Sequence, residues 1–562
     1  MTSYYISSKV PADGGGSGLS ENDPFGSLEC VRDILLGPGD QVLLERGSVF
    51  QDQALHLKEG SCGSEERPIL IAAYGNGPAP VINANGMGQW LQDYNTTEIG
   101  GHRYRAVIST AVLLKDVQYI EVEGLEITNS RELGNPDGLA YNDRDAMNRT
   151  GVAVIAQDAG TLHHIVLAGL NIHDVTGNVY DKHLANGGIY CIAHYPKDPS
   201  RRETDIARFD DMRIVGNRLD TVGRWGIAVG YTAYLNELDA DDYGDGTIAD
   251  EAIARWGHTG VLVENNYVKD AGGDAITVMY CDRPLVQYNV AQGAARQVND
   301  VDYSATDFGK VAAGIWPWRC KNAVFQYNEV FGMRGGAHGN DDGQAWDADY
   351  GDGTLYQYNY SHGNTGGTVM FCMSKSVNNT FRYNIAQGDL KGAIDIPDNP
   401  DAHIYHNTFV IPEGGTIVRD NHVGGHALVE NNIFINAGRE PVPGNWTQGG
   451  SPVTYANNLY CNFADMPDDP AGRAVPDGMD ALRGPGSAPT APDPDGMIRV
   501  HDDPDATTVF DGYRPVAQGP AFGMAKPIED RNGFAQEKDF LGNDVARGDD
   551  AGGDAVGAIV RP

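Results

Sequence analysis

The chain of 562 residues has no long apolar run and few cysteines, and these shortages exclude several classes of protein. Without eighteen consecutive apolar residues, no transmembrane helix is expected. Seven scattered cysteines without a C-x-x-C pair argue against a zinc cluster or a disulfide framework and fit a reducing compartment. The opening MTSYYISSKV lacks the basic and apolar regions of a signal peptide. We therefore expect a cytoplasmic protein, with secretion after signal removal as the alternative.

Basic side chains are also scarce, since 41 Lys and Arg face 77 Asp and Glu, a net charge of −36. Such a field repels phosphate backbones, which excludes nucleic acid as an expected partner. It also disfavours polyanionic sugars unless cations bridge them. The charge favours a neutral substrate, and we expect neither nucleic acid nor a membrane as partner.

What the chain does contain is glycine, 72 residues of it, and a recurring asparagine at the end of short apolar segments. The marker asparagines are Asn217, Asn266, Asn289, Asn328, Asn359, Asn384, Asn407, Asn432 and Asn458. From Asn359 onward they are 25, 23, 25 and 26 residues apart. Three short strands and three turns fill such a step, so it predicts an all-β, right-handed parallel β-helix whose coils stack about 4.8 Å apart. A β-propeller would need blades of about 40 residues.

The rest of the chain is assigned from the same pattern. Residues 1–60 are predicted to form a strand and a helical cap with Ser27 as N-cap, and residues 61–465 the β-helix. Residues 466–562, rich in Pro, Gly and Asp, are predicted to pack along it as a loop-rich extension. Steps longer than about 24 residues, as between 217 and 266 and between 289 and 328, predict outward loops, where binding sites usually lie.

The strands that follow the markers can be aligned into columns, and the alignment places a candidate site. The predicted inward column is Ile227, Ile276, Ile315, Ala345, Val369 and Ile394. In this register Trp316 lies beside Trp346 and Trp318 beside Ala348. A further predicted column holds Tyr280, Arg319, Asp349, Met373 and Asp398. Tryptophans beside carboxylates and an arginine are typical of a sugar site.

The segment DGQAWDADYGDG carries the candidate catalytic acids Asp342, Asp347 and Asp349. Glycoside hydrolysis needs one acid to protonate the leaving oxygen and a second carboxylate as nucleophile or base. Arg319 on the neighbouring coil would lower the pKa of Asp349. In so acidic a chain, a solvated loop is the competing interpretation.

The opening, the asparagine-marked coils and the closing DFLGNDVARGDDAGGDAVGAI resemble the β-helix carbohydrate-active enzymes. The segment DGQAWDADYG resembles glycoside hydrolase family 136, the lacto-N-biosidases. This resemblance implies a retaining mechanism, with Asp342 as acid/base and Asp349 as nucleophile, and a milk-type oligosaccharide as substrate.

Gln344, His338 and Lys375 complete the predicted substrate-binding set. No cofactor or catalytic metal is expected, although Asp239 to Glu251 faintly resembles a calcium loop and a structural Ca2+ there is an alternative. The leading prediction is a glycosidase that releases a mono- or disaccharide. The alternatives are a polysaccharide lyase, a fructan transferase and a non-catalytic sugar-binding β-helix.

Overall fold

The computed structural model divides the chain into two compact units, each described here by itself. The first comprises Met1–Ala240, Ala249–Pro284 and Ala294–Ala312, and the second Asp241–Ile248, Leu285–Gly293 and Ala313–Pro562. The structure describes residues 1–12, 15–97, 103–130, 147–179, 181–238, 246–298, 311–335, 342–419, 424–447, 452–476, 481–484, 510–529, 534–535, 538–546 and 553–561.

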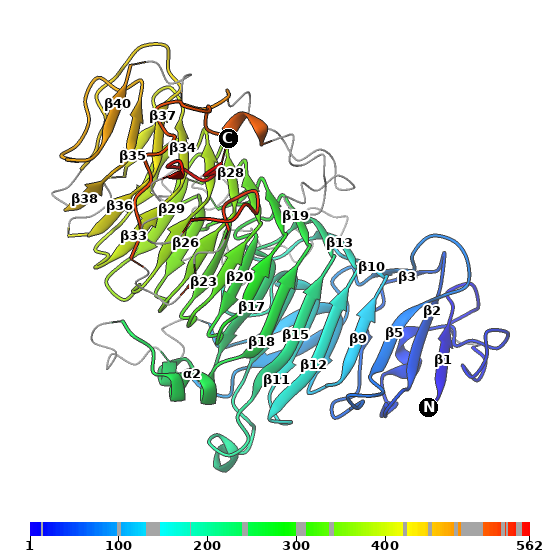
Figure 1. Ribbon diagram of the computed structural model, residues 1–562. Helices are drawn as coiled ribbons and strands as arrows, with labels where there is room; N and C mark the ends of the chain where they lie inside the picture. The colour runs from blue at the N-terminus through cyan, green and yellow to red at the C-terminus, as the bar shows by residue number, and fades with distance from the viewer. Residues whose placement is uncertain are drawn as a thin grey trace. The chain divides into compact units, whose positions relative to one another are not determined.

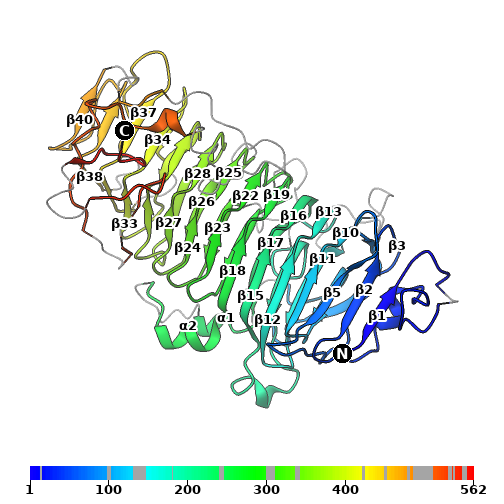
Figure 2. The same cartoon turned by 45° about the vertical axis from the view of Figure 1, so that its right-hand side comes forward.

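Each unit is a stack of coils whose strands form three parallel sheets, A, B and C, so the predicted right-handed parallel β-helix is confirmed (Figures 1 and 2). In the first unit, sheet A contains β1 (Ser3–Ile6), β2 (Gln41–Glu45), β5 (Ile69–Tyr74), β9 (Ile120–Glu123), β12 (Thr161–Ala168), β15 (Arg208–Val215) and β18 (Thr259–Glu264). Sheet B contains β3 (Val49–Gln51), β6 (Val81–Asn83), β10 (Glu126–Asn129), β13 (Asn171–Val175), β16 (Arg218–Val222) and β19 (Tyr267–Lys269). Sheet C contains β4 (Leu55–His56), β8 (Arg105–Lys115), β11 (Asn148–Ala156), β14 (Gly187–Ala193), β17 (Trp225–Thr232) and β20 (Ile276–Met279), and β7 (Gln89–Asp93) pairs antiparallel with β8.

The second unit repeats this arrangement. Its sheet A contains β21 (Leu285–Gln287), β24 (Val324–Gln326), β27 (Leu355–Gln357), β30 (Thr380–Arg382), β33 (Ala402–Tyr405), β36 (Ala427–Glu430) and β38 (Val453–Ala456). Its sheet B contains β22 (Val290–Gln292), β25 (Glu329–Phe331), β28 (Tyr360–His362), β31 (Ile385–Gln387), β34 (Thr408–Ile411), β37 (Ile433–Asn436), β39 (Leu459–Cys461) and β40 (Arg473–Val475). Its sheet C contains β23 (Ile315–Trp318), β26 (Gln344–Asp349), β29 (Gly367–Cys372), β32 (Lys391–Asp395) and β35 (Thr416–Val418).

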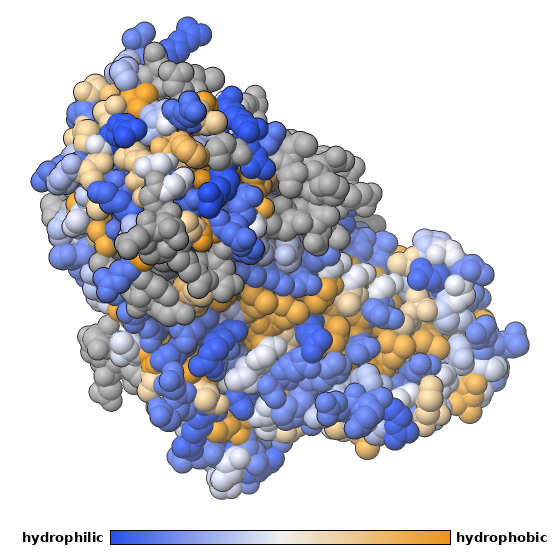
Figure 3. Space-filling model, in the orientation of Figure 1, coloured by the Kyte–Doolittle hydropathy of each residue, from blue (hydrophilic) through white to orange (hydrophobic). Residues whose placement is uncertain are grey.

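Columns of aliphatic side chains fill the interior of the coils. In sheet A of the first unit, one column with 0% exposure consists of Val42, Ile71, Val122, Leu167, Ile214 and Val263. Burying such a side chain stabilises the fold by about 1.5–3 kcal/mol relative to leaving it exposed, so each coil is held by the next. On the outside, Figure 3 shows hydrophobic residues gathered over coils of the first unit on the face drawn.

The marker asparagines form a hydrogen-bonded ladder in the second unit. From Asn328 to Asn458, each marker's side-chain oxygen accepts from the backbone N–H and the side-chain amide of the preceding marker, at 2.8–3.1 Å. The left-handed residue is the one before the marker, such as Tyr358 with φ 57° or Tyr383 with φ 51°. The ladder therefore satisfies buried turn groups from coil to coil.

Few helices accompany the strands: the structure describes α1 (Leu235–Leu238), α2 (Asp250–Trp256) and the 3-10 turns η1 (Leu28–Val31), η2 (Pro199–Arg201) and η5 (Asp511–Tyr513). Ser27 caps η1 by accepting from the N–H of Glu29, but the predicted helix is only this single turn. In the described part of the chain, no helix has the length and apolarity needed to span a bilayer. All seven cysteines are described and all are free thiols.

The described C-terminal segments pack on the second unit. Phe510, Phe540 and Val556 are fully buried in a hydrophobic cluster with side chains of sheet B such as Tyr360 and Ile433. The coils themselves continue to Val475, the end of β40.

Candidate active site

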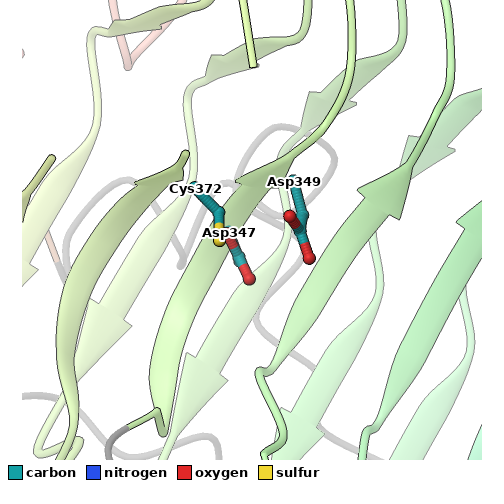
Figure 4. A group of neighbouring side chains, drawn as sticks. All are labelled: Asp347, Asp349 and Cys372. Carbon is teal, nitrogen blue, oxygen red and sulfur yellow. The ribbon is translucent and has the colours of Figure 1, made fainter. Parts of the chain in front are cut away.

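The outer face of β26 carries two aspartates. Ile315, Trp346, Val369 and Ile394 form a column through neighbouring strands of sheet C and are 0% exposed, so they face the core. Because successive side chains of a strand point to opposite faces, Asp347 and Asp349 point away from that core. Figure 4 shows the two carboxylates grouped with the thiol of Cys372 from β29.

The register predicted for β26 is therefore wrong by one residue. Trp346, not Ala345, continues the inward column, and Trp318 lies opposite Asp349 rather than Ala348. The predicted column that held Asp349 is in fact a column of left-handed residues, and Tyr350, with φ 51°, occupies its place there. A one-residue slip exchanges the two faces of a strand, which moves Asp347 outward and Trp346 inward.

Trp346 consequently cannot stack on a substrate. It is fully buried and lies 5.7 Å from Tyr356, ring centre to ring centre. The Tyr356 hydroxyl donates to the main-chain oxygens of Asp347, at 2.9 Å, and Ile315, at 3.2 Å. Trp346 and Tyr356 thus form the rigid support beneath the aspartates.

The carboxylate oxygens of Asp347 and Asp349 and the sulfur of Cys372 lie within 4.8 Å of one another. Asp347 is 3% exposed and Asp349 9% exposed. Two carboxylates this close and this buried repel each other when both are ionised. Such a pair is suited to supply one proton donor and one ionised carboxylate, the combination used by general-acid and nucleophile pairs.

Asp342 belongs to the same electrostatic neighbourhood. Burial raises the pKa of the Cys372 thiol well above its ordinary value, and the charges of Asp349, Asp347 and Asp342 raise it further. Asp342 itself is partly exposed and precedes β26. The charges of all three candidate acids therefore raise the pKa of the same thiol.

Glycines allow the chain to reach this point. Gly343 has φ +101°, a backbone conformation that favours glycine. A Cβ atom on Gly366 would lie 2.5 Å from the main-chain oxygen of Asp342, and one on Gly335 would lie 2.7 Å from it. Side chains at these positions would push Asp342 away from the strand that carries the other acids.

Trp316 and Trp318 belong to β23, the strand that pairs with β26, and Trp318 lies directly opposite Asp349. That they bind substrate stays a prediction. Trp318 is the more exposed of the two and stacks on Tyr350 with ring centres 4.8 Å apart. Trp316 is 6% exposed. An accessible aromatic ring beside carboxylates is the arrangement with which proteins hold the apolar faces of sugars.

A polar group beside the acids extends the site to the next coils. The Gln344 amide donates to Asp395 at 2.9 Å, and Arg419 lies 3.7 Å from the same carboxylate. On the outer face, Asp347 of β26 lies opposite Met370 of β29, and Met370 lies opposite Asp395 of β32. Sequence reasoning named Gln344 but missed Asp395 and Arg419. The sequence contains a pattern that could have found Asp395: it comes directly after the inward Ile394, as Asp347 comes directly after the inward Trp346.

The other predicted site residues have varied positions. Arg319 is buried. Its guanidinium donates to the main-chain oxygen of Tyr350 at 3.2 Å, and its backbone N–H donates to the main-chain oxygen of Asp349. Lys375 is partly exposed after β29, and Asp398 is exposed after β32. Tyr280 follows β20 in the first unit and is 1% exposed. His338 lies outside the described residues.

Among the residues that the structure describes, two groups of side chains have the composition of a metal site. Asp347, Asp349 and Cys372 would need a thiolate, which the raised pKa of Cys372 opposes. Glu59, Asp116 and Asp158 also lie close together, but Lys115 is 2.8 Å from Glu59 and Lys197 is 3.1 Å from Asp158. Residues 239–245 of the predicted calcium loop lie outside the described part. The absence of a cofactor stays a prediction.

Comparison with known proteins places this chain in a family. The chain is 48% identical over 98% of its length to the lacto-N-biosidase of Bifidobacterium longum subsp. longum. The crystal structure of the GH136 lacto-N-biosidase from Eubacterium ramulus matches with 44% identity and a TM-score of 0.70, over 81% of this chain and 68% of that one. The chain belongs to glycoside hydrolase family 136. It spans 36% of the length of the Bifidobacterium lacto-N-biosidase. No general family model matches the chain.

Proposed function

We propose that the chain is a retaining glycoside hydrolase that releases a disaccharide from a neutral oligosaccharide. The observation that carries the proposal is Asp349, which points outward on β26 with a second carboxylate, Asp347, within 4.8 Å. Retaining enzymes hold their two carboxyl groups about 5–5.5 Å apart, so this closeness supports Asp347 as the alternative partner of Asp349. Asp342 is preferred as the partner from the segment DGQAWDADYG, which resembles family 136. The membership in family 136 supports the same reaction class.

In the proposed mechanism, Asp349 attacks the anomeric carbon while Asp342 gives its proton to the leaving glycosidic oxygen. The bond between sugar and oxygen breaks, and an ester forms between the sugar and Asp349. Asp342 then removes a proton from water, and the resulting nucleophile displaces Asp349 with a second inversion. The product keeps its anomeric configuration, and both acids return to their starting states.

Asp347 is the third acid and the runner-up for the acid/base role. Its carboxylate lies in the same cluster as Asp349, so its charge opposes a second ionised group there. We assign it the role of keeping one proton within the group of acids. Asp342 is preferred as acid/base because it is partly exposed, so a departing sugar and an entering water can reach it.

The substrate class follows from charge and from the relatives. A net charge of −36 disfavours anionic glycans. Both relatives are lacto-N-biosidases, and we propose by extension that this chain releases lacto-N-biose from oligosaccharides that end in it. Trp318 would stack on a sugar ring, and Asp395 with Gln344 would hold hydroxyl or amide groups beside it.

The experiment that tests this function follows hydrolysis of lacto-N-tetraose and of an aryl lacto-N-bioside by NMR. We expect the β-disaccharide as first product, and an α-product would overturn the retaining mechanism. Asp349→Asn is expected to abolish turnover of both substrates. Asp342→Asn should keep activity on the aryl substrate and be accelerated by azide, because azide needs no general base. If Asp347→Asn shows that azide effect instead, the acid/base role passes to Asp347.

A further inference from the structure

Tyr356 of β27 belongs to a column of buried side chains inside sheet A of the second unit. The column consists of Val286, Phe325, Tyr356, Phe381, Ile404, Val429 and Tyr455. The ring centre of Tyr356 lies 4.8 Å from that of Phe325 and 6.2 Å from that of Phe381. Because phenylalanine fills the core on both neighbouring coils, the hydroxyl of Tyr356 is not needed to fill space, and its contacts have to explain it.

The contacts of this hydroxyl join two strands of sheet C. It donates to the main-chain oxygens of Asp347 in β26, at 2.9 Å, and of Ile315 in β23, at 3.2 Å. Ile315 lies directly opposite Trp346, the residue before Asp347. Burial, with the charges of Asp347 and Asp349, raises the pKa of Tyr356 well above its ordinary value, so the hydroxyl keeps its proton and stays a donor. One phenol therefore links the strand of the acids to the strand of Trp316 and Trp318.

We propose that Tyr356 is a positioning residue of the active site, because its hydroxyl fixes the main chain of Asp347 from inside the coil and so sets where the two carboxylates emerge outside. The inference rests on the proposed function, in which Asp349 is the nucleophile and Asp347 its neighbour. Successive side chains of a strand point to opposite faces, so a bond that holds the backbone on the inner side also orients the outer side chains. Reacting groups tolerate little displacement, since a shift of about 1 Å can cost about 10²-fold in rate.

Tyr455 of β38 makes the same kind of bond away from the acids. It occupies the same column, is 3% exposed, and donates its hydroxyl to the main-chain oxygen of Trp446 at 2.6 Å. Trp446 belongs to the segment between β37 and β38, which carries none of the proposed catalytic acids. Removing this hydroxyl therefore removes an equivalent buried bond without acting on β26.

The test compares Tyr356→Phe with Tyr455→Phe in steady-state kinetics on the aryl lacto-N-bioside, at a temperature well below the melting of either variant. Tyr356→Phe should lower kcat about tenfold and change KM less than about twofold, because the acids lose alignment while the contacts that bind substrate remain. Tyr455→Phe should keep both constants within about twofold. Thermal unfolding should show a similar fall in melting temperature for the two variants, since each loses one buried hydrogen bond. Stability alone would then not explain the difference in kcat.

Equal kcat values in the two variants overturn the proposal, as does a rise in KM without a fall in kcat. A second readout needs no turnover: amide hydrogen exchange followed by mass spectrometry. Tyr356→Phe should speed exchange in the peptides that cover β23 and β26, and Tyr455→Phe should leave those peptides unchanged. A parent without activity on either substrate overturns the proposed function, and the positioning role falls with it. An active parent with unaltered exchange of β23 and β26 in Tyr356→Phe overturns the positioning role alone.

Discussion

The buried aspartates of the second unit have two kinds of surroundings. Asp389, after β31, is 3% exposed and accepts four hydrogen bonds: from Ser361 at 2.7 Å, Thr368 at 2.9 Å, and the backbone and side chain of Asn364 at 2.9 and 2.8 Å. Each donor offsets part of the cost of burying the carboxylate. Asp389 is a structural acid, since it ties the turn after one coil to the next.

Asp347 and Asp349 are buried to a similar degree, but each has another acid as a near neighbour. Burial beside like charge costs stability, and a fold keeps such a cost where chemistry needs it. Burial alone therefore does not distinguish a candidate catalytic aspartate from a structural one in this β-helix. The described surroundings differ: Asp389 accepts from four donors, whereas Asp347 and Asp349 lie beside each other and beside the thiol of Cys372.

The strongest test of this difference neutralises one aspartate from each of the two surroundings. Asp349→Asn should lower kcat by at least about 10³-fold, because the nucleophile is lost, while the melting temperature stays equal or rises as like-charge repulsion is relieved. Asp389→Asn should instead keep kcat within about threefold and lose about 1–3 kcal/mol of unfolding free energy. Steady-state kinetics and thermal unfolding of both variants check this double contrast. Equal effects of the two variants on kcat would erase the distinction.

The asparagine ladder supplies the next largest effect. Asn384→Ala removes the oxygen that accepts from Asn359 and the amide that donates to Asn407 and to the Tyr356 carbonyl. Buried groups left without partners should cost about 2–4 kcal/mol in urea unfolding. Asn83→Ala is the control: its partly exposed amide bonds Gln51, and we expect a loss below about 0.5 kcal/mol. A loss of equal size at both positions would contradict the ladder's role.

The fold could be predicted because the ladder is local and repeated. A marker such as Asn384 recurs at nearly constant steps, and stacking identical coils is the arrangement that makes such a repeat useful. The inward columns of unbroken aliphatic residues, such as Ile227 with Ile276 and Val369 with Ile394, were also predicted correctly.

The candidate site was harder because β26 does not follow the aliphatic rule. Its core position holds Trp346, whereas the sequence pattern predicts that the small Ala345 faces the core and that Trp346 stacks on a sugar. The resulting slip hid that Asp347 faces outward and that Cys372 lies opposite Asp349. Sequence alone does not say which of two neighbouring apolar residues fills a coil, because volume and support from Tyr356 decide it.

Substituting Trp318 tests the corrected register of β26. Trp318→Ala removes the more accessible aromatic face, which lies opposite Asp349, and should raise KM about tenfold with kcat changed less than threefold. Trp90→Phe, in the antiparallel strand β7 of the first unit, serves as control and should leave KM unchanged. If the register first predicted from the sequence were right, replacing Trp346 would raise KM more than replacing Trp318. We expect instead that replacing Trp346 lowers stability, because its side chain is fully buried.

The smallest predicted effect concerns the rate at which Cys372 is alkylated. Burial first, and then the charges of Asp349, Asp347 and Asp342, raise the pKa of its thiol well above the ordinary value, so little thiolate is present at neutral pH. Iodoacetamide should therefore label it much more slowly than the exposed Cys30, measured in the same sample by peptide mass spectrometry. Asp347→Asn should speed the labelling of Cys372 about three- to tenfold without changing that of Cys30, because one like charge is removed. Labelling of Cys372 at the rate of Cys30 in the parent would mean that the acids do not act on the thiol, and the contrast between Asp389 and the pair Asp347 and Asp349 would lose its electrostatic basis.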